Sequence, residues 1–330
     1  MLDKKKIILA FIFLTLAFVG CKRHVSKTNE RITIDGLAQG TFFHVVYYGN
    51  ADKNTIKQGI DSILTLIDNS LSLWNENSTL SRVNRNEKVK LDSVFIENFN
   101  LACQIANLTN GAFDFTIGNL VKAYGFANQQ RRKLNDKEID SLLQGVDYRK
   151  VSITPDGYLQ KPNITSLDFN AVAQGYTTDK ISAYLLSKGL NDFVVDVGGE
   201  VYAHGSKPNN QYWTIGIEDP AEDSLSEIKY SQTITLKNQS VVTSGSSRKY
   251  YVENGVKYSH TIDPKTGKPV RHRLLSVSVV ANQSYMADGL ATAFMVVGLD
   301  KAKAFLAAHK QYKAYFIYTN DKGKYEFEAF

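Results

Sequence analysis

The sequence SLDFNAVAQGYTTDKISAYLLSKGLNDFVVDVGGEVYAH, residues 166–204, decides the fold class of this chain. Residues 167–169 predict a short buried strand, and residues 172–187 predict a helix that Gly189 ends. Residues 192–204 predict two strands interrupted by Gly198 and Gly199. Strands and helices therefore alternate without the regular rhythm of a parallel sheet, which favours the α+β class.

The rest of the chain repeats this irregular order. Apolar residues at helical spacing predict helices at residues 54–73, 92–109, 136–143, 286–297 and 300–310. Alternating residues predict strands within residues 30–48, 212–217, 249–260 and 275–281 and a hairpin at the C-terminal end, and residues 75–81 predict a polar loop. Neither an internal repeat nor a linker divides the chain. We therefore expect a single α+β domain over residues 31–330, built of mixed, largely antiparallel sheets with packed helices.

The N-terminal residues differ from the rest in composition. Three lysines, Lys4 to Lys6, precede an apolar run over residues 7–19 that is too short to span a bilayer, as in an export signal. Gly20-Cys21 follows and resembles the lipobox of bacterial lipoproteins, in which the cysteine is lipidated. We expect a signal peptide at residues 1–20, a lipidated tether at residues 21–30 starting with Cys21, and an exported protein anchored to a bacterial membrane and facing the periplasm. Ordinary secretion with an incidental cysteine is the alternative.

Composition narrows the class of partner and of site. The chain is 43% hydrophobic and 22% charged, with a net charge of +6, and no basic run suits a nucleic-acid groove. We therefore expect an acidic small molecule as ligand and no nucleic acid. Only Cys103 would remain after Cys21 is lipidated, which excludes an intramolecular disulfide and a cysteine-rich zinc site.

Three segments could carry chemistry. Asp288 and Thr292 are four residues apart in a predicted helix, so their oxygens share one face and suit a hard cation such as Mg²⁺. Taken alone, an Asp near a helix start more often caps the helix, and a helical Thr bonds back to its own turn. Residues 244–248 (SGSSR) could bind a phosphate, and His260, three residues before Asp263, could act as a general base. These residues alone do not select a reaction.

Seven segments together, in this order, resemble the ApbE family of FAD:protein FMN transferases over residues 39–298. They are Gly40-Thr41; Ser72-Leu73-Trp74 with residues 78–84 (STLSRVN); residues 111–118 (GAFDFTIG); Leu167-Asp168-Phe169 to Asp179; Val197-Gly198-Gly199-Glu200; Thr243-Ser244-Gly245 with residues 258–267 (YSHTIDPKTG); and residues 287–292 (ADGLAT).

The resemblance implies a Mg²⁺ site and a flavin site in a cleft. Asp288, Thr292 and a backbone carbonyl of residues 174–177, assigned to Thr177, would hold the metal. Trp74 stands where the family often has a Tyr beside the adenine, Gln39 where many relatives have Met, and Gln174 where Lys or Glu is usual. The implied FAD-contacting residues are Gln39, Trp74, Ala112, Phe113, Asp114, Gln174, Lys180 through a phosphate, and Ile262 through its backbone.

The implied reaction is phosphoryl transfer. A Thr or Ser hydroxyl of a target protein attacks the FMN-side phosphorus of FAD, and AMP leaves. His260 is the candidate base, and Asp263 would orient it. The family's targets imply acceptor flavoprotein subunits of membrane redox pumps as partners. Two alternatives remain open: a pyrophosphatase that hydrolyses FAD to FMN and AMP, and a lipoprotein that only binds flavin.

Overall fold

The computed structural model describes residues 30–126, 133–218, 230–245, 250–253, 256–259 and 261–330. The predicted signal peptide and most of the predicted tether, with Cys21, lie outside these residues, as does His260. Strand β1 begins at Arg31, the first residue of the predicted domain.

An antiparallel sheet of eight strands forms the centre of the fold, in the order β1-β2-β5-β6-β9-β12-β13-β14. Its strands are β1 (Arg31–Ala38), β2 (Thr41–Tyr48), β5 (Phe193–Val197), β6 (Glu200–His204), β9 (Gln239–Gly245), β12 (Leu274–Ala281), β13 (Lys313–Thr319) and β14 (Tyr325–Ala329). Three two-stranded ladders add β3 (Ser152–Ile153) with β4 (Leu159–Gln160), β7 (Trp213–Glu218) with β8 (Tyr230–Leu236), and β10 (Tyr250–Glu253) with β11 (Val256–Ser259). The predicted α+β class with largely antiparallel sheets is confirmed.

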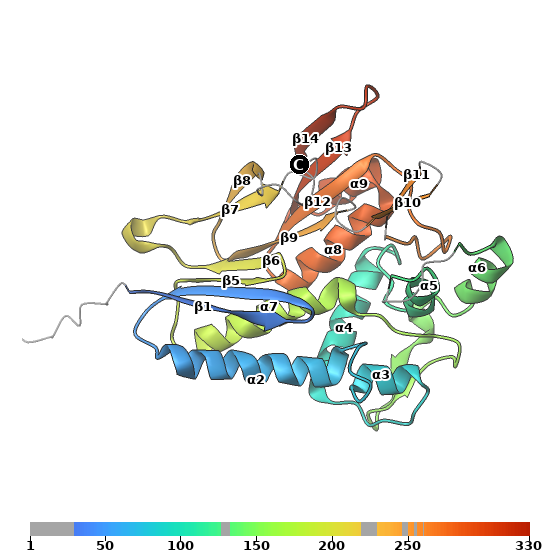
Figure 1. The fold of residues 1–330 in the computed structure, drawn as a ribbon, viewed down its shortest axis with the longest axis horizontal. Helices are drawn as coiled ribbons and strands as arrows, with labels where there is room; N and C mark the ends of the chain where they lie inside the picture. Colours follow the sequence, from blue (N-terminus) through green and yellow to red (C-terminus); the bar gives the residue numbers. More distant parts are fainter. Residues whose placement is uncertain (1–29, 127–132, 219–229, 246–249, 254–255, 260) are drawn as a thin grey trace, which may run out of the picture.

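The helices lie mainly against one face of this sheet (Figure 1). They are α2 (Lys53–Leu71), α3 (Thr79–Asn84), α4 (Ser93–Leu108), α5 (Gly118–Ala123), α6 (Asp136–Leu143), α7 (Asn170–Ser187), α8 (Ser284–Val297) and α9 (Leu299–Ala308), with 3₁₀ turns at Tyr148–Lys150 and Pro208–Asn210. The prediction of a loop through residue 81 was wrong, because Ser78 accepts a hydrogen bond from the Ser81 N–H and so begins α3.

Alternating side chains explain why both faces of the sheet are covered. In β2, Val45 and Tyr47 pack with Ile56 and Ile60 of α2, whereas Val46 points to the opposite face. On that opposite face, residues of the β7–β8 ladder such as Trp213 join the apolar cluster. The sheet is therefore buried on both sides where it positions α7.

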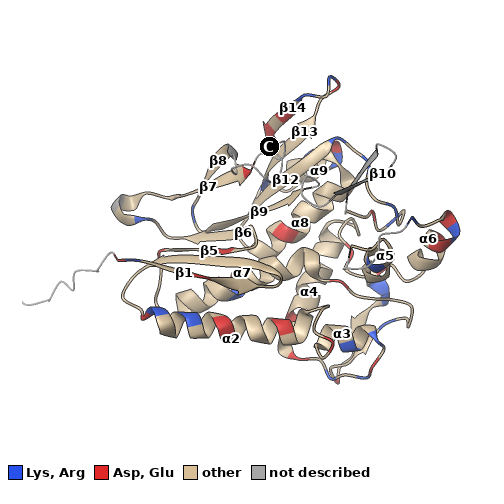
Figure 2. Cartoon of the chain, viewed as in Figure 1, with Lys and Arg blue, Asp and Glu red and all other residues tan. Residues whose placement is uncertain are grey.

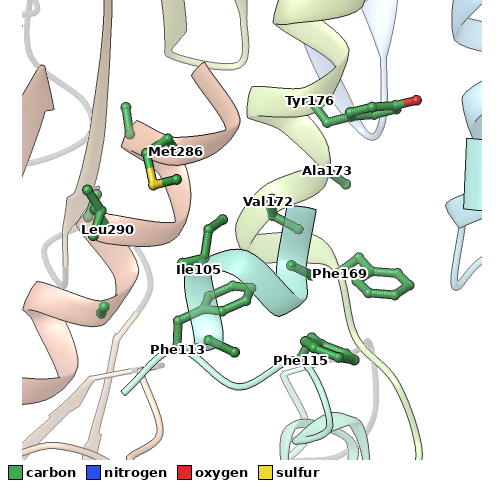
Figure 3. Packing of buried hydrophobic residues seen from close by; sticks show 14 of the residues in the cluster. Ile105, Phe113, Phe115, Phe169, Val172, Ala173, Tyr176, Met286 and Leu290 are labelled. Carbon is green, nitrogen blue, oxygen red and sulfur yellow. The ribbon is translucent and has the colours of Figure 1, made fainter. Parts of the chain in front are cut away.

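The largest apolar cluster lies where α4, α7 and α8 meet. Figure 3 shows Val172 and Ala173 of α7 and Met286 and Leu290 of α8 around Ile105 of α4. The rings of Phe95, Phe99, Phe115 and Phe169 contact one another at the lower end of this cluster. Close packing of this kind fixes the relative positions of the helices to fractions of an ångström. No helix within the described residues is long and apolar enough to cross a membrane.

Candidate active site between helices α7 and α8

Helices α7 and α8 run antiparallel and are joined by two sets of hydrogen bonds, one turn apart. The Gly175 N–H donates to Asp288 Oδ2 at 3.1 Å. One turn further along α7, the Asp179 carboxylate accepts from the N–H groups of Ser284 and Tyr285 at 2.8 and 3.0 Å. Moving forward one turn on α7 thus moves back one turn on α8. Ala171 lies one turn before Gly175 on α7, and Thr292 lies one turn after Asp288 on α8.

Glycine at position 175 is required by this close approach. A Cβ at that position would lie 2.5 Å from the Ser284 carbonyl oxygen and 2.8 Å from the Tyr285 Cα, both of which are backbone atoms. Such a contact is far shorter than van der Waals packing allows. The absent side chain is what lets the α7 backbone reach the Asp288 carboxylate.

Asp288 is a buried carboxylate at the centre of this interface. It is 5% exposed, and burial raises its pKa, with a smaller contribution from the nearby Asp179 carboxylate in the same direction. One turn later, the Thr292 hydroxyl lies 3.4 Å from the Ser244 hydroxyl of β9. A buried carboxylate beside hydroxyl and carbonyl oxygens is the set of ligands that a hard divalent cation prefers. No cluster of three or more His, Cys, Asp or Glu side chains occurs among the described residues, so a cation here would need those neutral oxygens.

The geometry does not favour Thr177 as the backbone ligand. Its hydroxyl donates to the Ala173 carbonyl at 2.7 Å, and it lies in a regular part of α7, where carbonyls face the N–H four residues on. The backbone departs from helical geometry instead at Ala171 (φ −88°, ψ 19°), at the start of α7. Carbonyls at a kink are the ones that become available to other partners. The assignment to Thr177 stays a prediction, and the kinked turn around Ala171 is an alternative source of the backbone carbonyl.

Gln39 and Gln174 lie together on the side of α7 that faces the sheet. Gln39 occupies the tight turn between β1 and β2 with φ 52°, and its Nε2 donates to the Thr177 hydroxyl at 2.7 Å. Gly198 leaves room for Gln174, since a Cβ there would lie 2.7 Å from Gln174 Nε2. Gln39 Oε1 is buried and accepts no hydrogen bond from the described residues. The structure thus brings together two of the predicted flavin-contacting residues.

Lys180 is on a different side of α7. Its Nζ pairs with the Glu97 carboxylate of α4 at 2.6 Å and lies over the Tyr176 ring, 5.2 Å from the ring centre. The Tyr176 hydroxyl donates to the same carboxylate, and Figure 3 shows its ring directed away from α8. In this structure the Lys180 ammonium group is paired with Glu97, and its predicted phosphate contact stays a prediction.

The segment with Ala112, Phe113 and Asp114 is buried beside α4. Ala112 and Phe113 belong to the main apolar cluster. Asp114 accepts from the backbone N–H groups of Thr116 and Tyr148 and from the Thr116 hydroxyl, which gives it a structural role. Burial raises its pKa. Any flavin contact of this segment would therefore have to involve its backbone or the few side-chain atoms that remain accessible.

The remaining predicted residues, Trp74, Ile262, Asp263 and His260, come from other segments of the chain. Trp74 follows α2 and is 58% exposed, as a stacking platform for a ligand would be. Ile262 is buried against Leu120 and Tyr124 in the loop after β11. Asp263 Oδ1 accepts from the Lys265 N–H and so shapes that loop. His260 lies outside the described residues, and its predicted role with Asp263 stays a prediction.

Sequence analysis assigned no role to two further acidic residues, one before α7 and one within it. Asp179 caps α8 from another helix, and Asp168 is a buried carboxyl that accepts from the Asn170 N–H at the start of α7. Burial raises the pKa of both, that of Asp179 despite its hydrogen bonds. Both residues belong to one segment that resembles the family, from Leu167 to Asp179, but nothing local in the sequence shows their partners.

A cavity of about 190 Å³ lies elsewhere, between the end of α3 and the β3–β4 ladder. Val83, Tyr158, Leu159 and Lys161 are among its lining residues. None of the predicted site residues lines it, so it is not the flavin cleft expected from the sequence.

Comparison with known proteins identifies the family. The model of the ApbE family matches residues 39–316. An "FAD:protein FMN transferase" from Vibrio cholerae serotype O1 is 31% identical over 326 residues, which cover 95% of this chain and 94% of that protein. Its namesake from Escherichia coli K12 is 29% identical over 310 residues, 89% of this chain and 87% of that protein.

Solved structures agree with this result. The flavin transferase ApbE from Vibrio cholerae matches with a TM-score of 0.80 at 30% identity and covers 91% of this chain and 97% of that chain. The apo flavinyl transferase ApbE of Pseudomonas stutzeri matches with a TM-score of 0.82 at 28% identity, over 91% of this chain and 94% of that chain. Family model, relatives and structures all span most of the sequence, and the chain belongs to the ApbE family.

Proposed function

We propose that this protein transfers FMN from FAD to a Thr or Ser hydroxyl of an acceptor flavoprotein, with Mg²⁺ and with release of AMP. The observation that carries the proposal is the buried Asp288 carboxylate, one helical turn from the Thr292 hydroxyl and in contact with the α7 backbone. The names of the relatives support flavin transfer as the reaction.

The residues present fit a magnesium ion. Asp288 supplies one negative charge, Thr292 a hydroxyl oxygen and the kinked turn at Ala171 a carbonyl oxygen. Burying a carboxylate without a cation is unfavourable, and the raised pKa of Asp288 reflects that cost. When bound, Mg²⁺ would neutralise charge on the diphosphate of FAD.

The protein's own residues would then position the reactants. Trp74 would stack on the adenine, and Gln39 and Gln174 would contact the flavin half. The acceptor oxygen forms a bond to the FMN-side phosphorus, the bond from that phosphorus to the bridging oxygen breaks, and AMP leaves with the bridging oxygen. The hydroxyl proton passes to a base, for which His260 remains the candidate.

A single assay tests the function. The full chain in detergent is incubated with FAD, Mg²⁺ and an acceptor domain of a membrane redox flavoprotein that contains a target Thr. Flavin fluorescence that stays with the acceptor after denaturation supports the proposal. Free FMN with AMP would show a pyrophosphatase instead, and FAD binding without either product would show a flavin-binding lipoprotein.

Asp288→Asn is the variant that connects this assay to the site. Replacing the carboxylate by an amide of the same shape should lower transfer at least about a hundredfold, because the metal loses its only charged ligand. Asp300→Asn on the exposed surface of α9 is the matched control and should keep the wild-type rate. Equal rates for the two variants would contradict the site assignment.

We also propose that the protein is exported and anchored through a lipid on Cys21. The support is the basic and apolar N-terminal sequence before Gly20-Cys21, and the fact that β1 starts soon after it, at Arg31. Cys21→Ser should release the protein from the membrane fraction of the producing cells. A variant that remains bound as tightly as the wild type would contradict the anchor.

A further inference from the structure

Helix α8, which carries Asp288 and Thr292, has no N-terminal cap of its own. Its N-cap residue is Gln283, whose side chain makes no capping hydrogen bond, and no acidic residue lies in its first turn. The first N–H groups of a helix need an acceptor, and in a buried helix water does not supply it. Ser284, the first residue of α8, is fully buried.

The missing acceptor comes from α7. Asp179 Oδ1 accepts from the Ser284 N–H at 2.8 Å and Oδ2 accepts from the Tyr285 N–H at 3.0 Å, so both carboxylate oxygens are engaged. Asp179 precedes these partners by more than a hundred residues. The Asp179 carboxylate therefore caps the N-terminus of α8 and also joins α8 to α7 by hydrogen bonds.

We propose that Asp179 is a positioning residue for the metal site, and this inference rests on the function proposed above. Asp179 and Gly175 are one turn apart on α7, and their partners Ser284 and Asp288 are one turn apart on α8. The cap thus sets the height of α8 relative to α7. That height decides whether Asp288 meets the Gly175 N–H, and it also sets the position of Thr292, one turn further along α8.

Asp179 acts through α8 and not by contact with the metal. Both of its oxygens accept backbone hydrogen bonds, and rigid helices transmit a shift of one end to the other. Its loss therefore has two separable effects: two buried N–H groups lose their acceptor, and the register of the two helices becomes free to slip. The first lowers stability, and the second lowers metal affinity.

Two variants separate these effects. Asp179→Ala removes both the N-terminal cap of α8 and the hydrogen bonds that tie α8 to α7. Adding Gln283→Asp to it gives α8 a cap from its own N-cap position, where the backbone is already extended (φ −127°, ψ 142°), but does not restore the tie. Asp52→Ala is the control, because Asp52 caps α2 by accepting from the Thr55 N–H far from the metal site.

The measurements are the melting temperature without metal or flavin, the affinity for Mg²⁺ alone by titration calorimetry, and the affinity for FAD without metal by fluorescence. We expect Asp179→Ala to melt at a lower temperature and to bind Mg²⁺ at least about tenfold more weakly, with unchanged FAD affinity. The double variant should regain most of the melting temperature and keep the weak Mg²⁺ binding. Asp52→Ala should lose only stability.

Three results would overturn the inference. If Asp179→Ala binds Mg²⁺ as tightly as the wild type, Asp179 is only a structural cap. If the double variant regains the Mg²⁺ affinity of the wild type, the tie between α7 and α8 is not needed. If Asp179→Ala does not fold, Asp179→Asn, which keeps one acceptor oxygen, replaces it in both comparisons. Wild-type Mg²⁺ affinity in Asp179→Asn would likewise contradict the role of the tie. Failure of the wild type to bind Mg²⁺ would instead refute the proposed function.

Discussion

Helices α2 and α8 are stabilised in opposite ways. Helix α2 has its cap next to it in sequence, since Asp52 accepts from both the N–H and the hydroxyl of Thr55. It buries one side, with Ile56, Ile60 and Ile67, and exposes the other, where Lys57 pairs with Asp61. Figure 2 shows both basic and acidic residues along α2.

Helix α8 is buried over most of its surface and contains a single acidic residue, Asp288, and no basic one. Its cap comes from Asp179 on α7, and its closest approach to α7 depends on Gly175. Because α8 is apolar on most sides, it lacks the amphipathic pattern of a surface helix such as α2. Helix α8, which carries the proposed metal ligands, is therefore capped by a residue distant in sequence, whereas α2 is capped by the residue next to it.

The largest test of this contrast exchanges a glycine for alanine in each environment. Gly175→Ala places a Cβ against the backbone of Ser284, which cannot move without shifting α8, so we expect a loss of about 3 kcal/mol of unfolding free energy. Gly59→Ala in α2 meets the hydroxyl and the ring edge of Tyr184, which are side-chain and not backbone atoms, and Ala gains helix propensity, so we expect a smaller loss there. Denaturant unfolding of both variants measures the difference. Equal losses would contradict the view that α7 and α8 are in backbone contact.

A second test uses pH. Because burial raises the pKa of Asp288, ionising it opposes folding, so the metal-free protein loses stability as pH rises from about 4 towards neutrality. Asp288→Asn removes this dependence, and Asn can still accept from Gly175. In EDTA the variant should match the wild type near pH 4 and be more stable by about 2 kcal/mol near pH 7.5. A stability difference between the two proteins that stays constant over this range would contradict a raised pKa of Asp288. Added Mg²⁺ should reverse the order of the two proteins.

The smallest effect is expected at the N-terminus of α2. Hydrogen bonds from the Thr55 N–H and hydroxyl lower the pKa of Asp52. The cap therefore stabilises the protein above the ordinary Asp pKa of about 4 and is lost as pH falls through the lowered value. Asp52→Ala should lower the melting temperature slightly at pH 7, and this difference should shrink at a lower pH, once the pH falls below the ordinary Asp pKa. A difference that persists at the lower pH would mean that packing, and not the carboxylate, is what Asp52 contributes.

Much of the fold could be predicted from local patterns. The helices around residues 54–73, 92–109 and 136–143 were predicted to within a few residues because apolar spacing and capping residues are local. Helix α3 was missed because it is short and polar, and only the Ser78 cap, which can be recognised once the structure is known, separates it from a loop. The pairing of β6 with β9, far apart in sequence, could not be predicted from either strand alone.

The candidate site divides in the same way. The spacing of Asp288 and Thr292 placed both on one face of a helix, which needs only helical geometry. The ion pair of Lys180 with Glu97 could not be predicted, because only the packing of α4 against α7 brings the two residues together. The departure of α7 from a regular helix at Ala171 could not be predicted, because the kink has no local sequence signal.

The sequence by itself determined most of the helices and strands, the family and the two side chains on α8 that suit a cation. Only the tertiary structure decided which carboxylate caps α8, where α7 departs from a regular helix and how closely the two helices approach. The physical reason is range: hydrogen bonds within a helix join residues four apart, whereas those between α7 and α8 join residues more than a hundred apart. Such contacts exist only after the whole core has packed.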